Sequence, residues 1–343
     1  MQIADCKIGK GHKPFIIAEM SGNHNSSIER AIKIIETAAA CGAHAVKLQT
    51  YTADTLTINH TGGLFDIKDE TSLWKNRNLY ELYQEAYTPW EWHEQLFRCA
   101  ADNGIICFST PFDNTAVDFL EALNTPAHKV ASFENIDHPL LKKVAATGKP
   151  VIMSTGACSL SDLAESVEVL KSNGCKDLVL LKCTSNYPST PENSNLHTIP
   201  HLKNLFNCEV GLSDHTMGIG VPIAAVTLGA TVIEKHFCLS RAEGGVDSAF
   251  SLEPEELKAL VIETERAWLS LGEIQYGVQE SELKSMNFKR SIYVVEDIEA
   301  GDLFTNNNIR VIRPGDGMHP RFYEGLLGRK SSQGYKRGDP FRD

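Results

Sequence analysis

Short apolar segments recur along the chain, and longer stretches with helical character separate them. The apolar segments are Phe15–Glu19, Ala45–Gln49, Ile106–Thr110, His128–Ser132, Val151–Thr155, Leu178–Thr184, Val210–His215 and Val232–Phe237. Most are apolar at successive positions, which is typical of strands buried on both faces of a parallel sheet. A strand followed by a helix about eight times predicts an α/β protein with a (β/α)8 barrel. A doubly wound open sheet is the alternative, because alternation alone does not prove closure.

Helix start and stop signals lie between the apolar segments. Capping residues, prolines and glycines predict helices over 28–41 after Ser27, over 90–103 after Pro89, over 161–173 opened by Ser161, and over 255–271 after Pro254. Residues 51–87 form a long insert after the second segment, with paired glycines and several aromatic residues. A long loop after a barrel strand predicts a lid or a substrate-contacting loop.

The pattern changes near the end of the barrel region. Residues 279–289 are polar and predict a linker, and 290–343 contain short β-like pieces separated by Gly and Pro turns. We therefore expect a barrel domain over 1–278 and a small β-rich domain over 290–343. The small domain has few residues for a stable core, so we expect it to pack on another surface.

Composition narrows the class of protein. The 343 residues are 42% hydrophobic and 22% charged, which is typical of a soluble globular chain. A net charge of −11 argues against a nucleic-acid or anionic-membrane surface. The chain has nine cysteines, an odd number, and no C-x-x-C pair. No segment has the form of a signal peptide or a membrane span. We expect reduced thiols and a cytoplasmic protein.

Polar residues lie where the predicted strands end, which is where barrel enzymes carry their catalytic groups. Lys47 and Lys129, with Lys182 and Lys235 as further candidates, form a cationic set that suits a phosphate or carboxylate group. Hydroxyl groups accompany them on most strands. Glu19, Glu134, Glu234 and Asp247 form an acidic set that can move protons or hold hydroxyl groups. The residues alone do not assign these carboxylates to one role or the other.

His215 and His236 end two consecutive predicted strands. Adjacent strand ends in a barrel can bring two imidazoles to one ion. Two neutral imidazoles, together with water and substrate oxygens, suit a divalent first-row metal such as Mn²⁺, with Mg²⁺ or Co²⁺ as alternatives.

Several segments together resemble one enzyme family. They are Ile-Ile-Ala-Glu-Met-Ser-Gly-Asn-His-Asn at 16–25, Val-Lys-Leu-Gln-Thr at 46–50, Phe-Ser-Thr-Pro-Phe at 108–112, Gly-Leu-Ser-Asp-His-Thr at 211–216 and Ile-Glu-Lys-His-Phe at 233–237. In this order they resemble the sialic acid synthase family, and the C-terminal piece resembles its antifreeze-like (SAF) domain. Within the family, the segment Glu-Met-Ser-Gly-Asn-His-Asn at 19–25 and the insert resemble the pseudaminic acid branch.

The resemblance implies a condensation of phosphoenolpyruvate with the open-chain aldehyde of an N-acetylated amino sugar, releasing phosphate. It implies a phosphoenolpyruvate site made of Lys47, Thr110, Lys129, Ser132, Ser154, Ser185 and Ser213. It implies a sugar site made of Glu19, Gln49, Tyr187, Glu234, Asp247 and Arg313. His215 and His236 would bind the metal. Glu134 would transfer a proton, and Glu19 and Lys129 are the other catalytic candidates.

The resemblance also implies a domain-swapped homodimer, in which Arg313 reaches the sugar site of the neighbouring subunit. Ser185 departs from the family pattern, because many relatives carry Asn or another small polar residue there. Three alternatives stay open. They are the same reaction on a manno-configured sugar leading to neuraminate or legionaminate, a metal-free lyase with a Schiff-base lysine, and a carbohydrate-binding or ice-binding protein without catalysis.

Overall fold

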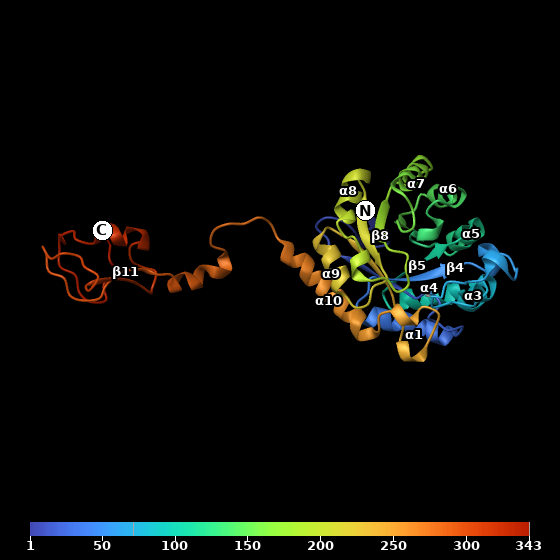
Figure 1. The fold of residues 1–343 in the computed structure, drawn as a ribbon, viewed down its shortest axis with the longest axis horizontal. Coiled ribbons are helices and arrows are strands. Elements are labelled where there is room, and N and C mark those ends of the chain that lie inside the picture. The colour runs from blue at the N-terminus through green and yellow to red at the C-terminus, as the bar shows by residue number, and fades with distance from the viewer. Residues whose placement is uncertain (71, 343) are drawn as a thin grey trace. The chain divides into compact units, whose positions relative to one another are not determined.

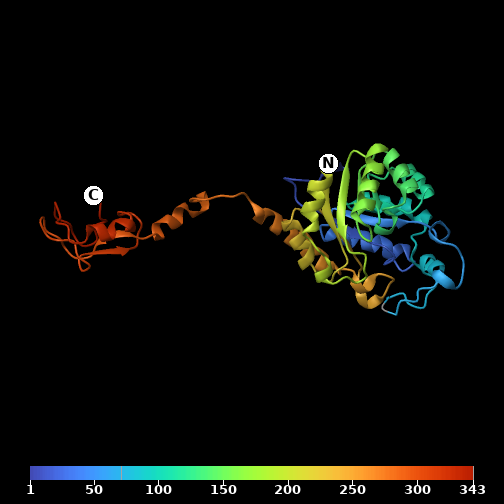
Figure 2. The same ribbon diagram turned by 45° about the horizontal axis from the view of Figure 1, so that its top comes forward.

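The computed structural model describes residues 1–70 and 72–342, which fall into two compact units, Met1–Gly272 and Glu273–Asp343. The first unit is built around a closed barrel of parallel strands surrounded by helices (Figures 1 and 2). In the described part of the chain, no helix combines the length and the hydropathy that a membrane span requires.

The barrel strands correspond to the apolar segments of the sequence. They are β3 Phe15–Glu19, β4 Ala45–Thr50, β5 Ile106–Pro111, β6 His128–Val130, β7 Val151–Ser154, β8 Leu178–Cys183, β9 Glu209–Asp214 and β10 Val232–His236. Each pairs in parallel with the next along the chain, and β10 closes the ring against β3 with His236 opposite Glu19. The predicted barrel is confirmed and the open sheet is excluded, while the predicted strand ends differ by one or two residues.

Helices cover the outside of the barrel. They are α1 Ile28–Ala40, α4 His93–Asp102, α5 Asn114–Ala122, α6 His138–Ala146, α7 Leu160–Ser172, α8 Thr198–Phe206, α9 Gly220–Thr227 and α10 Pro254–Leu271. Ser27 caps α1 by accepting a hydrogen bond from the Arg30 amide at 3.2 Å. The prediction that Ser161 opens α7 is wrong. Ser159 has an extended backbone and forms a capping box with Asp162, so Ser161 already lies inside the helix.

The lower part of the barrel interior is filled by apolar side chains. The cluster contains Phe15, Ile17, Ala45, Phe108, Ile152, Val179, Leu181 and Val232. An N-terminal hairpin, β1 Gln2–Ile3 and β2 Cys6–Lys7, adds Ile3 and Ile8 to the same cluster. The sequence patterns did not predict this hairpin. Because apolar residues fill the amino-terminal end, a ligand can enter the interior only from the carboxyl ends of the strands.

The insert after β4 has secondary structure of its own. It contains α2 Ala53–Leu56, η1 Gly63–Phe65 and α3 Leu79–Ala86, and η2 Trp90–Trp92 leads into α4. Leu82 and Ala86 of α3 are buried. The insert is therefore anchored to the barrel unit by packed side chains and can hold residues in fixed positions beside the strand ends.

The C-terminal unit has a separate small core. Its antiparallel strands are β11 Ser291–Val294 and β12 Ile309–Ile312, followed by η8 Pro320–Phe322 and α11 Tyr323–Leu326. The core residues are Ile292, Val294, Ile298, Phe304, Ile309, Leu326 and Phe341. Residues 279–289, predicted as a linker, contain the 3-10 helix η7 Glu280–Phe288, whose side chains are mostly exposed. The domain boundaries after 278 and 289 stay a prediction.

A candidate active site at the carboxyl ends of the barrel strands

The inward-facing positions of the strands change from apolar to polar toward the carboxyl ends. Side chains two residues apart in a strand share one face, so Glu19 follows Phe15 and Ile17 into the interior. The same spacing places Lys47, Thr110, Lys129, Ser154, Ser213, Glu234 and His236 above the apolar cluster, and all of them are buried. The fold therefore brings these predicted site residues into one interior.

The same alternation removes two of the candidate lysines from the interior. Lys182 follows the inward-facing Leu181 and therefore faces the helix layer. Lys235 follows Glu234 and forms an ion pair with Asp214 on the outer face, at 2.7 Å. The prediction that Lys182 and Lys235 join the cationic set is wrong, because neighbouring residues of a strand point to opposite faces.

Two lysines and two glutamates form a charged network in the interior. Lys47 Nζ pairs with Glu19, donates to Thr110 Oγ1 at 3.0 Å and lies 4.0 Å from Glu234 Oε2. Lys129 Nζ lies 3.6 Å from Glu234 Oε1. Burial opposes ionisation of Glu234, but the two ammonium groups outweigh it and lower the pKa. Burial raises the pKa of Glu19 although Lys47 opposes the rise.

Serine hydroxyls surround the second ammonium group. Lys129 Nζ donates to Ser154 Oγ at 2.7 Å, and Ser213 Oγ donates to Glu234 Oε1 at 3.0 Å. Ser132 and Ser185 meet at Gly156, where a side chain would collide with both hydroxyl groups. This collection of ammonium and hydroxyl donors can bind an anion such as a phosphate group.

Asn135 and Cys183 belong to the same region, although the sequence analysis did not single them out. Asn135 Nδ2 donates to the carbonyl oxygens of Ser154 and Gly156, at 3.2 and 2.9 Å, and so fixes the loop after β7. The Cys183 sulfur lies 3.7 Å from Ser185 Oγ. Burial raises the pKa of the Cys183 thiol, but hydrogen bonds with His215 and Ser132 and the charges of His215 and Lys129 together outweigh burial and bring the pKa to about 7. Cys183 shares its strand face with Leu181, and this spacing could have identified it.

The two predicted metal-binding imidazoles are neighbours. The ring centroids of His215 and His236 lie 5.4 Å apart. His215 Nδ1 must donate to the Thr184 carbonyl, at 3.0 Å, so in the neutral ring the lone pair lies on Nε2. Burial lowers the pKa of His215, but the hydrogen bond with Cys183 and the charge of Cys183 outweigh burial and raise it. His236 Nδ1 is buried without a hydrogen-bond partner. Burial and the charge of His215 lower the pKa of His236 well below its ordinary value, which keeps this imidazole neutral.

These features fit a divalent metal ion. A metal needs neutral imidazoles with free lone pairs, and an unpartnered buried nitrogen is a group that a bound ion would satisfy. Among the described residues, no group of three or more His, Cys, Asp or Glu side chains could hold an ion. The remaining coordination positions would therefore belong to water and to substrate oxygens.

A cavity of about 410 Å³ opens beside the imidazoles. Gln49, Glu134, Tyr187, His236 and Asp247 line its polar side. The insert supplies the apolar side, with Tyr51, Leu56, Ile67, Trp74, Leu79, Leu82, Tyr83 and Ala86. The insert, predicted to be a lid or a substrate-contacting loop, therefore forms one wall of this cavity. Its individual residues were not predicted, because the insert has no regular pattern of apolar positions.

Trp74 connects the insert to the loop after β10. Its indole Nε1 donates to the Val246 carbonyl at 3.0 Å, and its ring lies 5.8 Å from the Tyr187 ring. Asp247, the next residue, accepts a hydrogen bond from Ser21 Oγ. These contacts fix aromatic and acidic groups in the lining of the cavity.

Glu134 lies in the 3-10 turn η3 Ser132–Glu134, directly after β6. Its Oε2 is buried without a hydrogen-bond partner. Burial raises the pKa of this carboxyl group to about 7, and the Lys129 charge only partly opposes the rise. A carboxyl group with such a pKa can both accept and donate a proton near neutral pH.

Arg313 is the predicted site residue that lies outside the barrel unit. It follows β12 in the C-terminal unit, and its side chain is exposed. Its place at the sugar site stays a prediction.

The fold and the site define a (β/α)8 barrel protein with a cationic, hydroxyl-rich interior below two imidazoles. Residues 34–276 match the NeuB family, and residues 289–343 match the SAF domain. The chain belongs to the NeuB family.

The chain is similar to named enzymes over its whole length. It is 46% identical to the pseudaminic acid synthase of Campylobacter jejuni, covering 100% of this chain and 98% of the relative. It is 42% identical to the pseudaminic acid synthase of Helicobacter pylori, covering 95% and 96%. It is 35% identical to the N,N'-diacetyllegionaminic acid synthase of Campylobacter jejuni, covering 96% and 99%.

A solved structure supports the architecture. The N-acetylneuraminic acid synthetase of Leptospira borgpetersenii, in complex with citrate, superposes with a TM-score of 0.74 at 31% identity. The match covers 83% of this chain and 94% of that chain.

Proposed function

We propose that this protein joins phosphoenolpyruvate to 2,4-diacetamido-2,4,6-trideoxy-altrose, giving pseudaminic acid and phosphate. The observation that carries the proposal is the pair of buried ammonium groups, Lys47 and Lys129, in the same barrel interior as two neighbouring imidazoles. The choice of sugar rests on the 46% identity to a pseudaminic acid synthase, against 35% to a legionaminic acid synthase of the same species. The activity is that of a transferase.

Phosphoenolpyruvate carries a phosphate and a carboxylate, which need cationic and hydroxyl donors. Lys129 and Lys47 supply the charges, and the donors around them are Thr110, Ser132, Ser154, Ser185 and Ser213. Glu19 and Glu234 balance the two ammonium groups before the substrate arrives. This arrangement limits the cost of holding two buried cations without a ligand.

His215 and His236 would hold a divalent ion, and Mn²⁺ is the proposed metal. When bound, such an ion supplies Lewis-acid polarisation of a carbonyl oxygen. The chain orients His215 through the Thr184 carbonyl and encloses His236 against Phe250, whose ring centroid lies 4.9 Å away. Both residues can therefore hold an aldehyde-bearing substrate in one orientation above the ammonium groups.

In the reaction, C3 of phosphoenolpyruvate bonds to the aldehyde carbon of the sugar, and water adds at C2. The resulting tetrahedral centre expels phosphate. Glu134 transfers the proton, because its carboxyl group has a pKa of about 7 and lines the cavity. Gln49, Tyr187 and Asp247 hold the sugar from the cavity wall. Glu19 and Glu234 hold the sugar from the barrel interior. Lys47 and Lys129 stabilise the negative charge that develops during the step.

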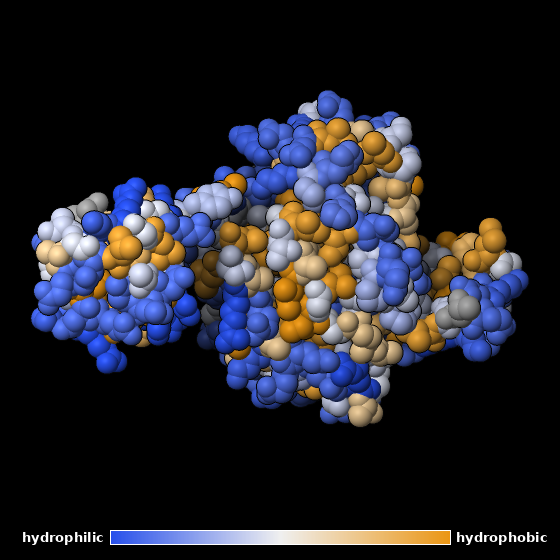
Figure 3. Space-filling view, turned by 60° about the vertical axis from the view of Figure 1, so that its left-hand side comes forward, coloured by the Kyte–Doolittle hydropathy of each residue, from blue (hydrophilic) through white to orange (hydrophobic). Residues whose placement is uncertain are grey.

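A domain-swapped homodimer completes the proposal. Several apolar residues are exposed on loops and turns of the barrel unit, including Ile58, Leu64, Phe133 and Ile136. Figure 3 shows hydrophobic patches among hydrophilic side chains on one face of the molecule. Phe133 lies beside Glu134 at the cavity, so a partner's C-terminal domain with Arg313 could cover this mouth. The protein is proposed to act in the cytoplasm.

The test is phosphate release from phosphoenolpyruvate in the presence of Mn²⁺, with three sugars offered separately. These are the diacetamido-trideoxy-altrose, the manno-configured diacetamido sugar and N-acetylmannosamine. Release with the altrose sugar alone, abolished by a chelator, supports the proposal. Release with another sugar would keep the reaction and change the branch. Release that continues in the chelator would favour the lyase with a Schiff-base lysine or another metal-free route.

A further inference from the structure

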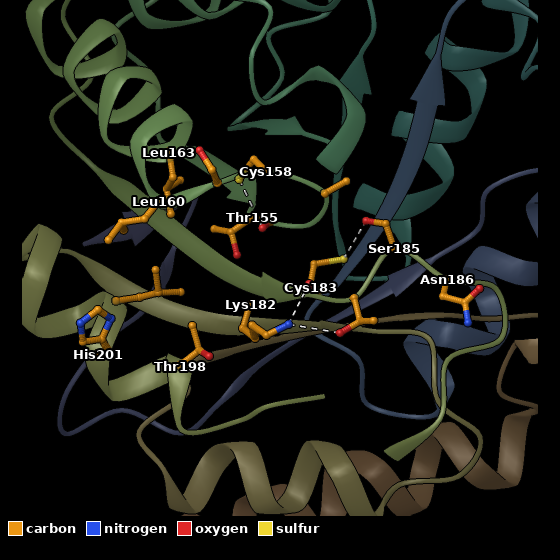
Figure 4. A pocket seen from close by; sticks show the side chains of 14 residues that line it. Thr155, Cys158, Leu160, Leu163, Lys182, Cys183, Ser185, Asn186, Thr198 and His201 are labelled. Carbon is orange, nitrogen blue, oxygen red and sulfur yellow. Dashed lines mark hydrogen bonds between the residues drawn. The ribbon is translucent and has the colours of Figure 1, made fainter. Parts of the chain in front are cut away.

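A second cavity lies between α7, α8 and the end of β8, and its lining includes Cys183 and Ser185, which also belong to the region that would bind phosphoenolpyruvate. Its volume is about 550 Å³, and none of its lining residues lines the cavity beside the imidazoles. Figure 4 shows its labelled side chains, with Leu160 and Leu163 on α7, Thr198 and His201 on α8, and Lys182 between them. Cavities of 300–1,000 Å³ are typical of small-molecule sites.

Lys182 gives this cavity its charge. Its Nζ donates to the Cys183 carbonyl at 2.9 Å and to Thr184 Oγ1 at 3.1 Å, which uses two of its three donors. Lys182 forms no ion pair with any described residue, and no Asp or Glu lines the cavity. Burial lowers the pKa of Lys182, and the charge that opposes this shift is the Cys183 thiolate rather than a carboxylate. The protein thus supplies a partly desolvated cation without an acidic partner.

The walls around Lys182 are of two kinds. Leu160, Leu163 and Leu202 form an apolar side. Hydroxyl and imidazole groups of Thr155, Thr184, Thr198 and His201 line the same cavity, and the Thr184 hydroxyl contacts the Lys182 ammonium group. This combination fits an organic anion whose charged end meets Lys182 and whose apolar body meets the leucines.

Thr184 connects this cavity to the active site. Its hydroxyl accepts from Lys182 and donates to the Asn193 carbonyl at 2.9 Å, while its carbonyl accepts from His215 Nδ1 at 3.0 Å. A ligand that draws Lys182 away from Thr184 removes a hydrogen bond from Thr184, the residue whose carbonyl orients His215. Binding at one site and metal binding at the other are then linked, and the linkage acts in both directions.

We propose that this cavity binds a small organic anion through Lys182, with its apolar body against Leu160 and Leu163, and that binding is coupled through Thr184 to the metal affinity of His215. The charged end is a phosphate or a carboxylate. The proposal does not depend on the sugar substrate, because both of its parts can be measured without any substrate.

The first measurement uses 8-anilinonaphthalene-1-sulfonate, an anion with an apolar body, titrated into the full chain and followed by fluorescence. Lys182→Met should weaken binding about tenfold or more, and Lys182→Arg should retain it. Lys142→Met is the matched control, because Lys142 is exposed on α6 and lines neither cavity. Equal binding by Lys182→Met and the natural protein overturns the proposal, as does equal loss in the Lys142 control.

Adenosine 5′-monophosphate and benzoate then compete for the probe, which distinguishes a phosphate from a carboxylate ligand. The competing anion is added at saturation while free Mn²⁺ is measured by electron paramagnetic resonance. We expect the Mn²⁺ affinity to change at least about threefold in the natural protein and not in Lys182→Met. An unchanged Mn²⁺ affinity overturns the coupling. If neither anion displaces the probe, the assigned ligand chemistry is wrong.

Discussion

Lys235 and Asp214 form a buried ion pair between β10 and β9, with Nζ 2.7 Å from Oδ2. The two residues are direct partners in the strand register, and each immediately precedes one of the two proposed metal-binding imidazoles, His236 or His215. Lys235 also donates to the Thr216 carbonyl at 2.6 Å. Asp214 accepts from the amide and the hydroxyl of Thr216, at 3.1 and 3.0 Å. This pair therefore fixes both strand ends and the turn after His215.

Removing one partner should destabilise the protein and loosen the imidazole pair. Asp214→Asn leaves the buried Lys235 ammonium group without its carboxylate, and Lys235→Met leaves the buried Asp214 carboxylate without its cation. Either change should cost about 3–5 kcal/mol of unfolding free energy. The double variant Asp214→Leu with Lys235→Met should regain much of this stability, because no charge is left buried. Its Mn²⁺ affinity should still fall about tenfold, since the turn at Thr216 is no longer held.

Denaturant unfolding and Mn²⁺ titration separate the two effects. The exposed pair between Lys143 and Asp118, at 2.6 Å, provides the control. Lys143→Met should change the free energy of unfolding by about 1 kcal/mol or less. A double Asp214–Lys235 variant with unchanged Mn²⁺ affinity would show that the pair contributes stability alone.

Lys129 is expected to be essential for phosphoenolpyruvate. It donates to Ser154 and lies beside Glu234, so Lys129→Ala removes the charge and leaves a buried carboxylate facing the anion. We expect the KM for phosphoenolpyruvate to rise about a hundredfold or more, while the KM for the sugar changes little. Steady-state kinetics with Lys142→Ala as the control would decide the matter. Near-normal saturation by phosphoenolpyruvate would remove Lys129 from the site.

His236 is expected to be required for the response to metal. His236→Ala removes one of two imidazoles, and the remaining nitrogen of His215 cannot compensate for it. Addition of Mn²⁺ should then fail to restore turnover, and Mn²⁺ affinity measured directly should fall about a hundredfold. His12→Ala, at an exposed position, serves as the control. Full stimulation of His236→Ala by Mn²⁺ would exclude it as a ligand.

The strands and the polar interior could be predicted from the sequence for one physical reason. Parallel barrel strands are apolar on both faces, so a polar residue near a strand end is conspicuous, as Glu19 and Glu234 are. The spacing of two from the apolar cluster also distinguishes Lys129 from Lys182, and applying it strictly would have removed Lys182 and added Cys183.

Other parts of the site depend on contacts that no local pattern reveals. Trp74 reaches the cavity because its indole bonds to Val246, which is 172 residues away in the chain. The N-terminal hairpin is short, and its burial depends on Ile3 and Ile8 meeting the barrel interior. Arg313 lies in the C-terminal unit, and the role proposed for it depends on a second subunit.

Trp74 is expected to affect the sugar and not phosphoenolpyruvate. Trp74→Ala removes the hydrogen bond to Val246 and the contact with the Tyr187 ring. The apolar wall then opens, and the KM for the sugar should rise about tenfold or more while the KM for phosphoenolpyruvate stays unchanged. Trp74→Phe keeps an aromatic ring, so its KM for the sugar should lie between the values of the natural protein and Trp74→Ala. An equal rise in both constants would instead indicate a general disturbance of the barrel mouth.

Glu134 should show opposite effects on stability and activity. Burial raises the pKa of its carboxyl group from 4.5 to about 7, so the folded protein binds this proton more tightly than the unfolded chain. Its contribution to stability is complete below about pH 4.5 and is lost as the pH rises through about 7.

Glu134→Gln removes the ionisable group while keeping its shape. The variant should therefore gain about 1–3 kcal/mol of unfolding free energy at pH 8, and the gain should vanish near pH 4.5. Turnover should fall about a hundredfold or more at every pH, because the amide cannot transfer the proton. Denaturant unfolding at several pH values and steady-state rates test both parts, with Glu165→Gln on the exposed side of α7 as the control. A stability gain that does not depend on pH would contradict the assignment of a raised pKa to Glu134.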